Sequence, residues 1–310
     1  MLADLIGVVA PVLLIAGIGY WIEKAGPNLD TKSLSALVMM VGTPALVFSS
    51  LTSTDLPEAM LLQMSVGAFG ASVIASTLAA GFLLAAGLDI RSFLPSLSMP
   101  NSGNIGLPIV LLAFGETGLA VGVAFFFVIA ILQYTVMPII TAGSFSFGRI
   151  AKEPLVWAVA AVLFFKLSGL TPPAIVSQTT KLLGGMMIPV MVILLGAAIA
   201  RLEVRDFRTS LGLAVARLVI GVIAGTSVVI LLGATGVVAG SLFLMAAMPS
   251  AIVTYVFTER YGRDPEKVAG LIVASTVLTF AILPFLLWIA IGIAALDAPL
   301  ATWLSAVRLS

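Results

Sequence analysis

Side chains that commonly carry out chemistry are scarce in this sequence. None of its 310 residues is cysteine or histidine, which excludes thiol chemistry, disulfides, histidine metal sites and serine–histidine catalysis. Every aspartate and glutamate falls in a loop or at the end of an apolar segment, so no pair of buried carboxylates is indicated. We therefore expect no enzyme, no cofactor and no metal centre.

Polar residues gather instead in residues 99–108, which read MPNSGNIGLP inside a long apolar stretch. Proline lacks an amide hydrogen and clashes with the preceding turn, so this segment cannot remain a regular helix. Unwound backbone inside a bilayer is tolerated where it is buried in protein or lines a cavity. The residues expected to break the helix are Pro100, Gly103, Gly106 and Pro108. Asn101, Ser102 and Asn104 would then offer donors beside freed amides, and the positive end of the next half-helix would favour an anion.

A second such segment, residues 248–254, reads MPSAIVT. Pro249 interrupts this apolar stretch, and Ser250 contributes one hydroxyl. A kink that only eases helix packing is the alternative interpretation of either segment. The presence of two matching segments favours a binding site. We expect two crossed, broken helices near the middle of a membrane.

The elements that position these segments are membrane-spanning helices. The chain is 61% hydrophobic and 9% charged, with a mean hydropathy of +1.21, whereas a soluble domain carries roughly a quarter charged residues. The net charge of +1 gives no indication of a nucleic-acid partner. The first apolar run is expected to remain as the first span. Windows of about 20 apolar residues predict ten spans, at roughly 3–23, 32–53, 59–87, 92–113, 118–141, 153–170, 174–200, 207–233, 238–258 and 266–294.

Lysine and arginine positions predict the orientation of these spans. Loops after odd-numbered spans hold Lys24, Lys32, Arg91, Arg149, Lys152, Arg201, Arg205, Arg208, Arg260, Arg263 and Lys267. Loops after even-numbered spans, with both termini, hold only Lys166, Lys181 and Arg308. The odd loops are therefore expected in the cytoplasm, with both termini outside it.

The two halves of the sequence resemble each other at offsets of 145 to 149 residues. Pro44 matches Pro189, the MPN of residues 99–101 matches the MPS of residues 248–250, Gly115 matches Gly262, and Pro138 matches Pro284. We expect a first repeat at 1–141, a short cytoplasmic linker at 142–152 and a second repeat at 153–310. Because each repeat would hold five spans, the second would be inverted, as in many secondary transporters.

These motifs resemble the auxin efflux carrier family, among inverted-repeat carriers of bile acids and auxin, over essentially the whole chain. Residues 246–257 with Tyr261-Gly262 are similar to that family's ninth helix, and Pro100-Asn101 with residues 106–108 to its fourth. Residues 43–48 and 188–197 are similar to its second and seventh helices. The short central loop is typical of the compact prokaryotic branch, which implies the plasma (bacterial inner) membrane.

The resemblance implies a scaffold of helices 1, 2, 6 and 7 and a transport domain of helices 3–5 and 8–10. It also implies elevator movement and a homodimer formed through the scaffold. Asn101 would bind the substrate carboxylate, Tyr134 in Gln133-Tyr134-Thr135 would line the site, and Ile252 and Val253 would form a wall. The family's Asp and Lys pair in helix three is missing here, because residues 61–67 read LLQMSVG.

Arg217 is the one charge placed well inside a predicted span. It could attract anions on the cytoplasmic side; the favoured interpretation is that it reaches the interface or binds carbonyls of a broken helix.

With no carboxylate at the midplane, transport would follow the substrate gradient and membrane potential. Alternatively, sodium would bind neutral oxygens, with candidates Ser102, Asn104, Gln133 and Thr276.

The sequence thus predicts a secondary transporter of a small organic anion, either an auxin-like aromatic acid or a short carboxylate such as malonate. The few polar residues favour a monocarboxylate. A passive anion channel and a sodium-coupled carboxylate symporter of the same fold are the alternatives.

Overall fold

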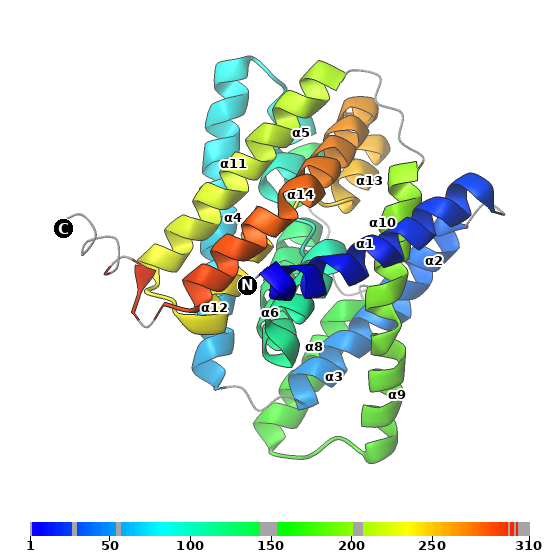
Figure 1. Cartoon of the computed structure of the whole chain (residues 1–310), viewed down its shortest axis with the longest axis vertical. Helices are drawn as coiled ribbons and strands as arrows, with labels where there is room; N and C mark the ends of the chain where they lie inside the picture. The colour runs from blue at the N-terminus through cyan, green and yellow to red at the C-terminus, as the bar shows by residue number, and fades with distance from the viewer. Residues whose placement is uncertain are drawn as a thin grey trace. The chain divides into compact units, whose positions relative to one another are not determined.

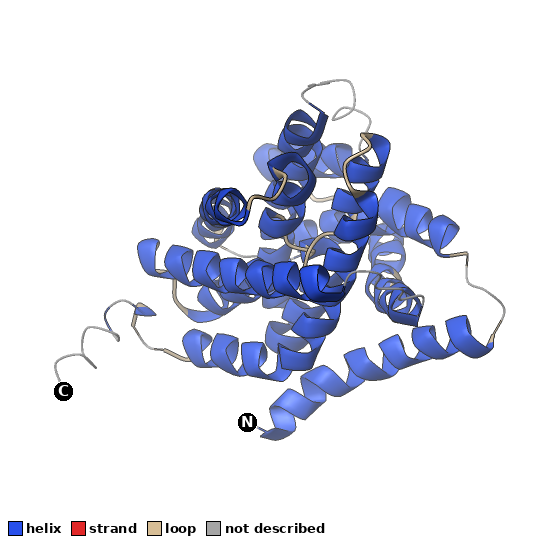
Figure 2. Ribbon diagram, turned by 90° about the horizontal axis from the view of Figure 1, so that it is seen from above, coloured by secondary structure: helices blue, strands red, loops and turns tan. Residues whose placement is uncertain are grey.

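The described part of the chain is helical and contains no strand (Figure 2). The structure is a computed structural model that describes residues 2–26, 30–53, 57–142, 154–200, 207–296, 298–300 and 302. Residues 143–152, nearly all of the expected linker, lie outside the described residues. The helices are α1 (Leu2–Ala25), α2 (Thr31–Leu37), η1 (Val38–Gly42), α3 (Thr43–Ser53), α4 (Glu58–Ala86), α5 (Ile90–Ser98), η2 (Ser102–Gly106), α6 (Leu107–Ala142), α8 (Pro154–Ser168), α9 (Ala174–Gly185), α10 (Met187–Ala200), α11 (Phe207–Leu231), α12 (Gly236–Ala247), α13 (Val253–Arg260) and α14 (Pro265–Ala294).

The chain divides into two compact units. Unit 1 comprises residues Met1–Leu56 and Ser146–Leu202, and unit 2 comprises Pro57–Phe145 and Glu203–Ser310. In unit 1, α1 crosses α10, and α3 packs against α8 and α9 (Figure 1). Gly19 of α1 and Gly196 of α10 lie against the backbone of the opposite helix, with no room for a side chain at either position. Small residues commonly allow such close crossings in membranes.

Two of the expected spans in unit 1 are each divided into shorter helical elements. The expected span 32–53 contains the π-helical turn η1, and Pro44 stands in the first turn of the next helix, α3. The expected span 174–200 breaks at Met186, and Pro189 stands in the first turn of α10. Proline cannot donate to the carbonyls of the preceding turn, so regular α-helical hydrogen bonding is interrupted before each of these prolines.

Unit 2 is organised around α12. Every residue from Val238 to Ala247 is buried, and α12 contacts α4, α6, α11 and α14. A helix that is apolar all round is buried either in protein or in lipid, and α12 is buried in protein. Helices α11 and α14 also pack against each other (Figure 1).

The long helix α6 reverses direction at Gly115. This glycine has φ 65° and ψ −157°, a backbone conformation outside the helical region that costs glycine little. Beyond the turn, Gly122 lies against the side chains of Val110 and Leu107. A straight helix would hold Gly122 and Val110 about 18 Å apart, so residues 107–114 and 116–142 are two antiparallel segments.

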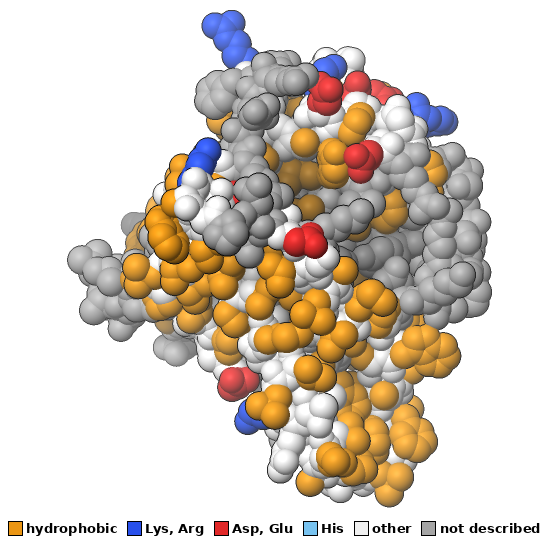
Figure 3. Space-filling view, turned by 90° about the vertical axis from the view of Figure 1, so that its right-hand side faces the viewer, with side chains coloured by type: hydrophobic (Ala, Val, Ile, Leu, Met, Phe, Trp, Pro, Cys, Tyr) orange, Lys and Arg blue, Asp and Glu red, His pale blue; other side chains and the backbone are white. Residues whose placement is uncertain are grey.

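Six helical stretches in the described part are long and apolar enough to cross a membrane, at 33–53, 58–86, 102–141, 174–194, 208–231 and 265–294. The stretch 102–141 includes the reversal at Gly115. Two further apolar helices, 154–168 and 236–247, are shorter. Hydrophobic side chains cover much of the face shown in Figure 3. Large apolar side chains that are exposed include Phe69 and Val73 on α4 and Phe285 on α14, as expected for helices that contact lipid.

Candidate functional site

Two interrupted segments lie in unit 2, and we refer to them together as the crossover. The first, residues 99–101, separates α5 from η2, and the second, residues 248–252, separates α12 from α13. Each contains a proline, Pro100 or Pro249. Since proline cannot donate a hydrogen bond to the preceding turn, α5 ends at Ser98 and α12 at Ala247.

Backbone hydrogen bonds join the two segments of the crossover. The amide of Asn101 donates to the carbonyl of Pro249 at 2.7 Å, and the amide of Ala251 donates to the carbonyl of Met99 at 3.1 Å. The middle residues of the two segments face each other as an isolated antiparallel bridge. The bridge satisfies backbone groups that would otherwise be unpaired among apolar helices.

Four helix ends meet at the crossover. Helices α5 and α12 end there, while α13 and η2, which continues into α6, begin there. The beginning of a helix presents unpaired amides and partial positive charge, and its end presents unpaired carbonyls and partial negative charge. The crossover can therefore stabilise an anion at one pair of helix ends and a cation at the other.

Asn101 is buried at the first of these helix beginnings, with its side chain 5% exposed. Its Oδ1 accepts a hydrogen bond from the amide of Asn104 at 3.3 Å, so the side chain caps η2. Its Nδ2 is buried and has no hydrogen-bond partner among the described residues. Leaving a buried donor unpaired costs about 1–3 kcal/mol. A bound acceptor would remove that cost.

The hydroxyl of Ser250 is a second buried group at the crossover without a partner in the described chain. The backbone amide of Ser250 donates to Oγ of Ser275 on α14 at 3.2 Å. Ser275 Oγ in turn donates to the carbonyl of Ile272 at 2.9 Å. The backbone thus holds Ser250 in place and leaves its hydroxyl unused.

A buried hydroxyl pair also fastens the crossover, and sequence reasoning missed it. Ser96 Oγ of α5 donates to Thr254 Oγ1 of α13 at 2.8 Å, linking the two halves of the chain. Thr254 Oγ1 donates to the carbonyl of Ala251 at 2.7 Å. Ser96 and Ser275 could have been noticed as small polar residues within apolar helices, but their partners depend on how the helices cross.

Arg217 of α11 reaches the other pair of helix ends. Its Nη1 donates to the carbonyl of Leu97 at 3.2 Å, and its Nη2 donates to the carbonyls of Ala246 at 2.9 Å and Met248 at 2.8 Å. Of the two interpretations of Arg217 drawn from sequence, these contacts match carbonyl binding at a broken helix.

The glycines expected to break the first helix also provide close packing. A Cβ on Gly103 would lie 2.7 Å from the ring of Phe126, and one on Gly106 would lie 2.7 Å from Sδ of Met245. Pro108 is buried in the first turn of α6. These residues let α6 and α12 approach the crossover.

The remaining candidate residues in and beside the two segments differ in how exposed they are. Ser102 is buried at 2% exposure, and Asn104 is half-buried. Ile252 is exposed at 42%, and Val253 is half-buried where α13 begins. Ile252 therefore offers an accessible apolar side chain two residues after Ser250.

On α6, Gln133 is buried and lies one turn beyond Ile129, on the same helix face. The side chain of Tyr134, the other candidate on this helix, lies outside the described residues.

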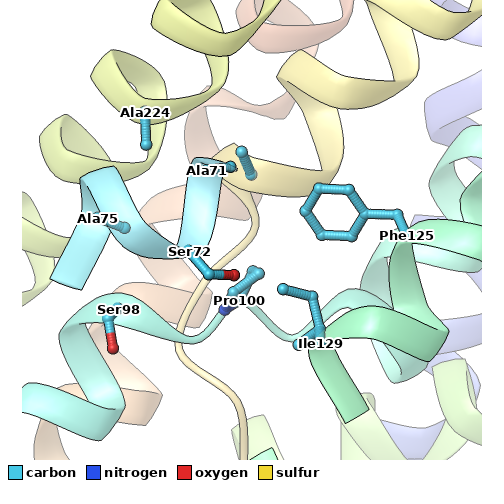
Figure 4. A pocket seen from close by; sticks show the side chains of 9 residues that line it. Ala71, Ser72, Ala75, Ser98, Pro100, Phe125, Ile129 and Ala224 are labelled. Atoms are coloured by element: carbon cyan, nitrogen blue, oxygen red, sulfur yellow. The ribbon is translucent and has the colours of Figure 1, made fainter. Parts of the chain in front are cut away.

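A small void lies beside Pro100, with room for about one water molecule. Small side chains line most of it, and Pro100 faces Phe125 and Ile129 across it (Figure 4). The lining residues come from five helices of unit 2 and from the first crossover segment: Ala71, Ser72, Ala75, Ser98, Pro100, Phe125, Ile129, Ala224 and Ala246. The first segment is therefore bordered mostly by apolar side chains, with a gap of this size beside Pro100.

A comparison with known families finds the same family model twice along the chain. The model, described as membrane transport protein, matches residues 4–146 and again residues 143–289. The chain belongs to this membrane transport protein family. The resemblance to auxin efflux carriers is thereby confirmed, as is the presence of two repeated halves.

A relative in the archaeon Methanothermobacter thermautotrophicus is similar along almost its full length. It is described as an uncharacterized transporter and is 28% identical over 296 residues, covering 90% of this chain and 96% of the relative. The chain described here, as a member of the membrane transport protein family, is therefore an all-helical, multi-pass membrane protein that transports a solute. The prediction that it is not an enzyme is confirmed by its family.

Proposed function

We propose that this transporter carries a small organic anion and binds its carboxylate at the crossover. The observation that carries the proposal is the buried, unpartnered Nδ2 of Asn101 at the beginning of a helix. A carboxylate oxygen accepts strongly from such a donor, and the partial positive charge of the helix end adds to the attraction. The unused hydroxyl of Ser250 supplies a second donor.

The number of donors favours a monocarboxylate. Asn101 Nδ2 and Ser250 Oγ are the two buried side-chain polar atoms without a hydrogen-bond partner in the crossover segments among the described residues. Two donors suit one carboxylate group, whereas a second carboxylate would need further donors. The exposed Ile252 would face the apolar part of such a substrate, and Gln133, Tyr134 and Val253 complete the proposed lining.

We assign unit 1 to the scaffold and unit 2 to the moving transport domain. The residue ranges of the two units support this assignment, because unit 1 contains helices α1–α3 and α8–α10 and unit 2 contains the whole crossover. In the proposed elevator cycle, unit 2 carries the anion across the membrane as one body. Ten spans in two inverted repeats, a homodimer through the scaffold and a position in the plasma membrane complete the proposal.

The proximity of the loop at Asp89 to the loop at Arg263 supports placing both loops on the same side of the membrane. Asp89 follows α4, and Arg263 precedes α14. The charge of Arg263 is close enough to contribute to lowering the pKa of Asp89, although the main cause is the hydrogen bond from the Ser92 hydroxyl. Both loops follow odd-numbered spans and are expected in the cytoplasm.

The test is a thermal-stability screen of the purified protein with benzoate, indole-3-acetate and malonate. A ligand that binds the folded state raises the apparent Tm, so we expect at least one monocarboxylate to raise it, with chloride at equal ionic strength as the control.

The best ligand is then used, radiolabelled, in proteoliposomes. Unlabelled substrate trapped inside should accelerate its uptake, whereas a channel shows no such exchange. Absence of any carboxylate-dependent stabilisation and uptake would contradict the proposal.

A further inference from the structure

Arg217 is the one charged side chain that is buried among the described residues. It is 1% exposed and lies inside α11, a helix apolar enough to span the membrane. An arginine keeps its positive charge, and a charge at this depth is costly unless other groups stabilise it. No carboxylate in the described chain pairs with it.

Carbonyl oxygens from two interrupted helices stabilise this charge. Leu97 lies in the last turn of α5, Ala246 lies in the last turn of α12, and Met248 follows directly in the crossover. All three carbonyls accept from the guanidinium within 3.2 Å. Because helix ends carry partial negative charge, both broken helices direct their negative ends at one cation.

The neighbouring backbone leaves room for the guanidinium. Gly221 follows Arg217 by one turn of α11 and faces α12 on the same side. A Cβ at Gly221 would lie 3.1 Å from Nη1 of Arg217 and 2.5 Å from the carbonyl oxygen of Ala246. A side chain at position 221 would therefore disturb both the cation and one of its carbonyl partners.

Carbonyls freed at broken helices are the groups with which many secondary transporters bind a sodium ion. Here a side chain already occupies such carbonyls. We propose that Arg217 is a resident cation of the crossover, which replaces a coupling metal ion and makes substrate binding independent of sodium. Its charge also balances one negative charge on the bound anion, a point that depends on the proposed function.

The first experiment uses no substrate. The apparent Tm of wild type is measured in sodium chloride and in N-methylglucamine chloride at equal ionic strength, and we expect the same value in both. Arg217→Ala should lower the Tm by roughly 5 °C or more, because three hydrogen bonds to a charged group are lost. Guanidinium chloride at about 10 mM should restore part of that loss, and urea at the same concentration should not.

A second pair of variants separates charge from packing and does not require the alanine variant to fold. Arg217→Lys keeps a cation near the carbonyls, whereas Arg217→Gln keeps donors without charge. We expect the lysine variant to be the more stable of the two. Equal stability of the two, stabilisation of wild type by sodium, or a wild-type Tm for Arg217→Ala would each overturn the proposal.

Substrate binding is tested separately. The stabilisation of wild type by benzoate is compared in sodium and in N-methylglucamine buffers. Equal stabilisation supports a resident cation, and stabilisation only in sodium overturns it. If no carboxylate binds in either buffer, the anion-binding proposal fails, while the cation experiments on Arg217 keep their own outcome.

Discussion

At the scale of single residues, one amide side chain has two different roles at the crossover. Asn101 uses its oxygen to cap η2 and leaves its nitrogen unpaired. Ordinary core asparagines have partners for both atoms, because each unpaired buried group is costly. A residue that completes only half of its hydrogen bonds is suited to a ligand that supplies the other half.

Substitution of Asn101 can separate these roles. Serine is about as good an N-cap as asparagine but lacks the amide donor. Asn101→Ser should therefore keep the Tm within a few degrees of wild type and weaken carboxylate binding about tenfold or more. Asn101→Ala should lose both stability and binding. Isothermal titration of the purified variants with the best carboxylate measures the loss.

Ser241→Ala is the matched control for this pair. Ser241 also has a buried hydroxyl without a partner, but in the middle of α12. Its removal should leave affinity unchanged, whereas Ser250→Ala should weaken it. Equal losses for Ser241→Ala and Ser250→Ala would contradict a site at the crossover.

Sequence reasoning at this scale identifies residues better than their partners. Asn101 and Ser250 stand out because each directly follows a proline in an apolar stretch. The links from Ser96 to Thr254 and from Ser250 to Ser275 span 158 and 25 residues. Those pairings depend on the crossing of helices, which local sequence does not encode.

At the scale of elements, prolines and glycines determine where helices end and how closely they pack. Pro100 and Pro249 predict interruptions, and helices do end at Ser98 and Ala247. The π-helical turn η1 has no proline within it, and the break at Met186 was likewise not predicted. Hydropathy averages over about 20 residues, so it does not resolve breaks of one turn.

Gly103→Ala should destabilise the protein by about 1–3 kcal/mol. The new methyl group would lie 2.7 Å from Cε2 of Phe126 on α6. Combining it with Phe126→Leu should recover part of the loss, because the smaller side chain makes room. Gly81→Ala on α4 is the control, since nothing lies within 4 Å of its Cβ position. Chemical denaturation in detergent measures all four proteins, and the absence of any rescue would contradict this explanation.

The N-cap of α5 predicts a pH dependence. Asp89 accepts from the Ser92 amide at 3.0 Å and the Ser92 hydroxyl at 2.6 Å, and that hydroxyl is the main reason its pKa is lowered. A carboxylate with a lowered folded-state pKa stabilises the fold above its unfolded pKa of about 4 and loses this effect as pH falls through the folded pKa. Asp89→Ala should therefore lower the Tm at pH 7, and its difference from wild type should begin to shrink only as the pH falls below about 4. A difference that persists unchanged in acid would exclude this cause.

At the scale of the whole molecule, two repeated halves supply one crossover. The family model matches each half once, and each half contributes one interrupted segment. Carbonyls at the ends of α5 and α12, the helices that lead into these segments, then accept hydrogen bonds from Arg217, together with the carbonyl of Met248. Composition and the repeat were sufficient to predict a helical membrane transporter, whereas the substrate depends on side-chain geometry that no repeat pattern contains.

The proposed inversion of the repeats can be tested with introduced cysteines, because the chain has no native cysteine. Glu116 and Glu266 are both exposed and lie just after the repeat-related glycines Gly115 and Gly262. In intact cells, a membrane-impermeant maleimide should label Glu116→Cys and should label Glu266→Cys only after permeabilisation. Labelling of both from the same side would contradict inverted repeats.

The central claim is that the Asn101 amide binds the substrate carboxylate, and nuclear magnetic resonance can observe that amide directly. The chain has three asparagines, Asn28, Asn101 and Asn104. Protein labelled with ¹⁵N at asparagine side chains should therefore give three pairs of NH₂ signals, and the pair missing in Asn101→Ser belongs to Asn101. On titration with the carboxylate that stabilises the protein, we expect the Asn101 signal to shift downfield in proton frequency, while the Asn28 signal stays unchanged. A carboxylate that is bound and transported while the Asn101 signal does not move would contradict the account.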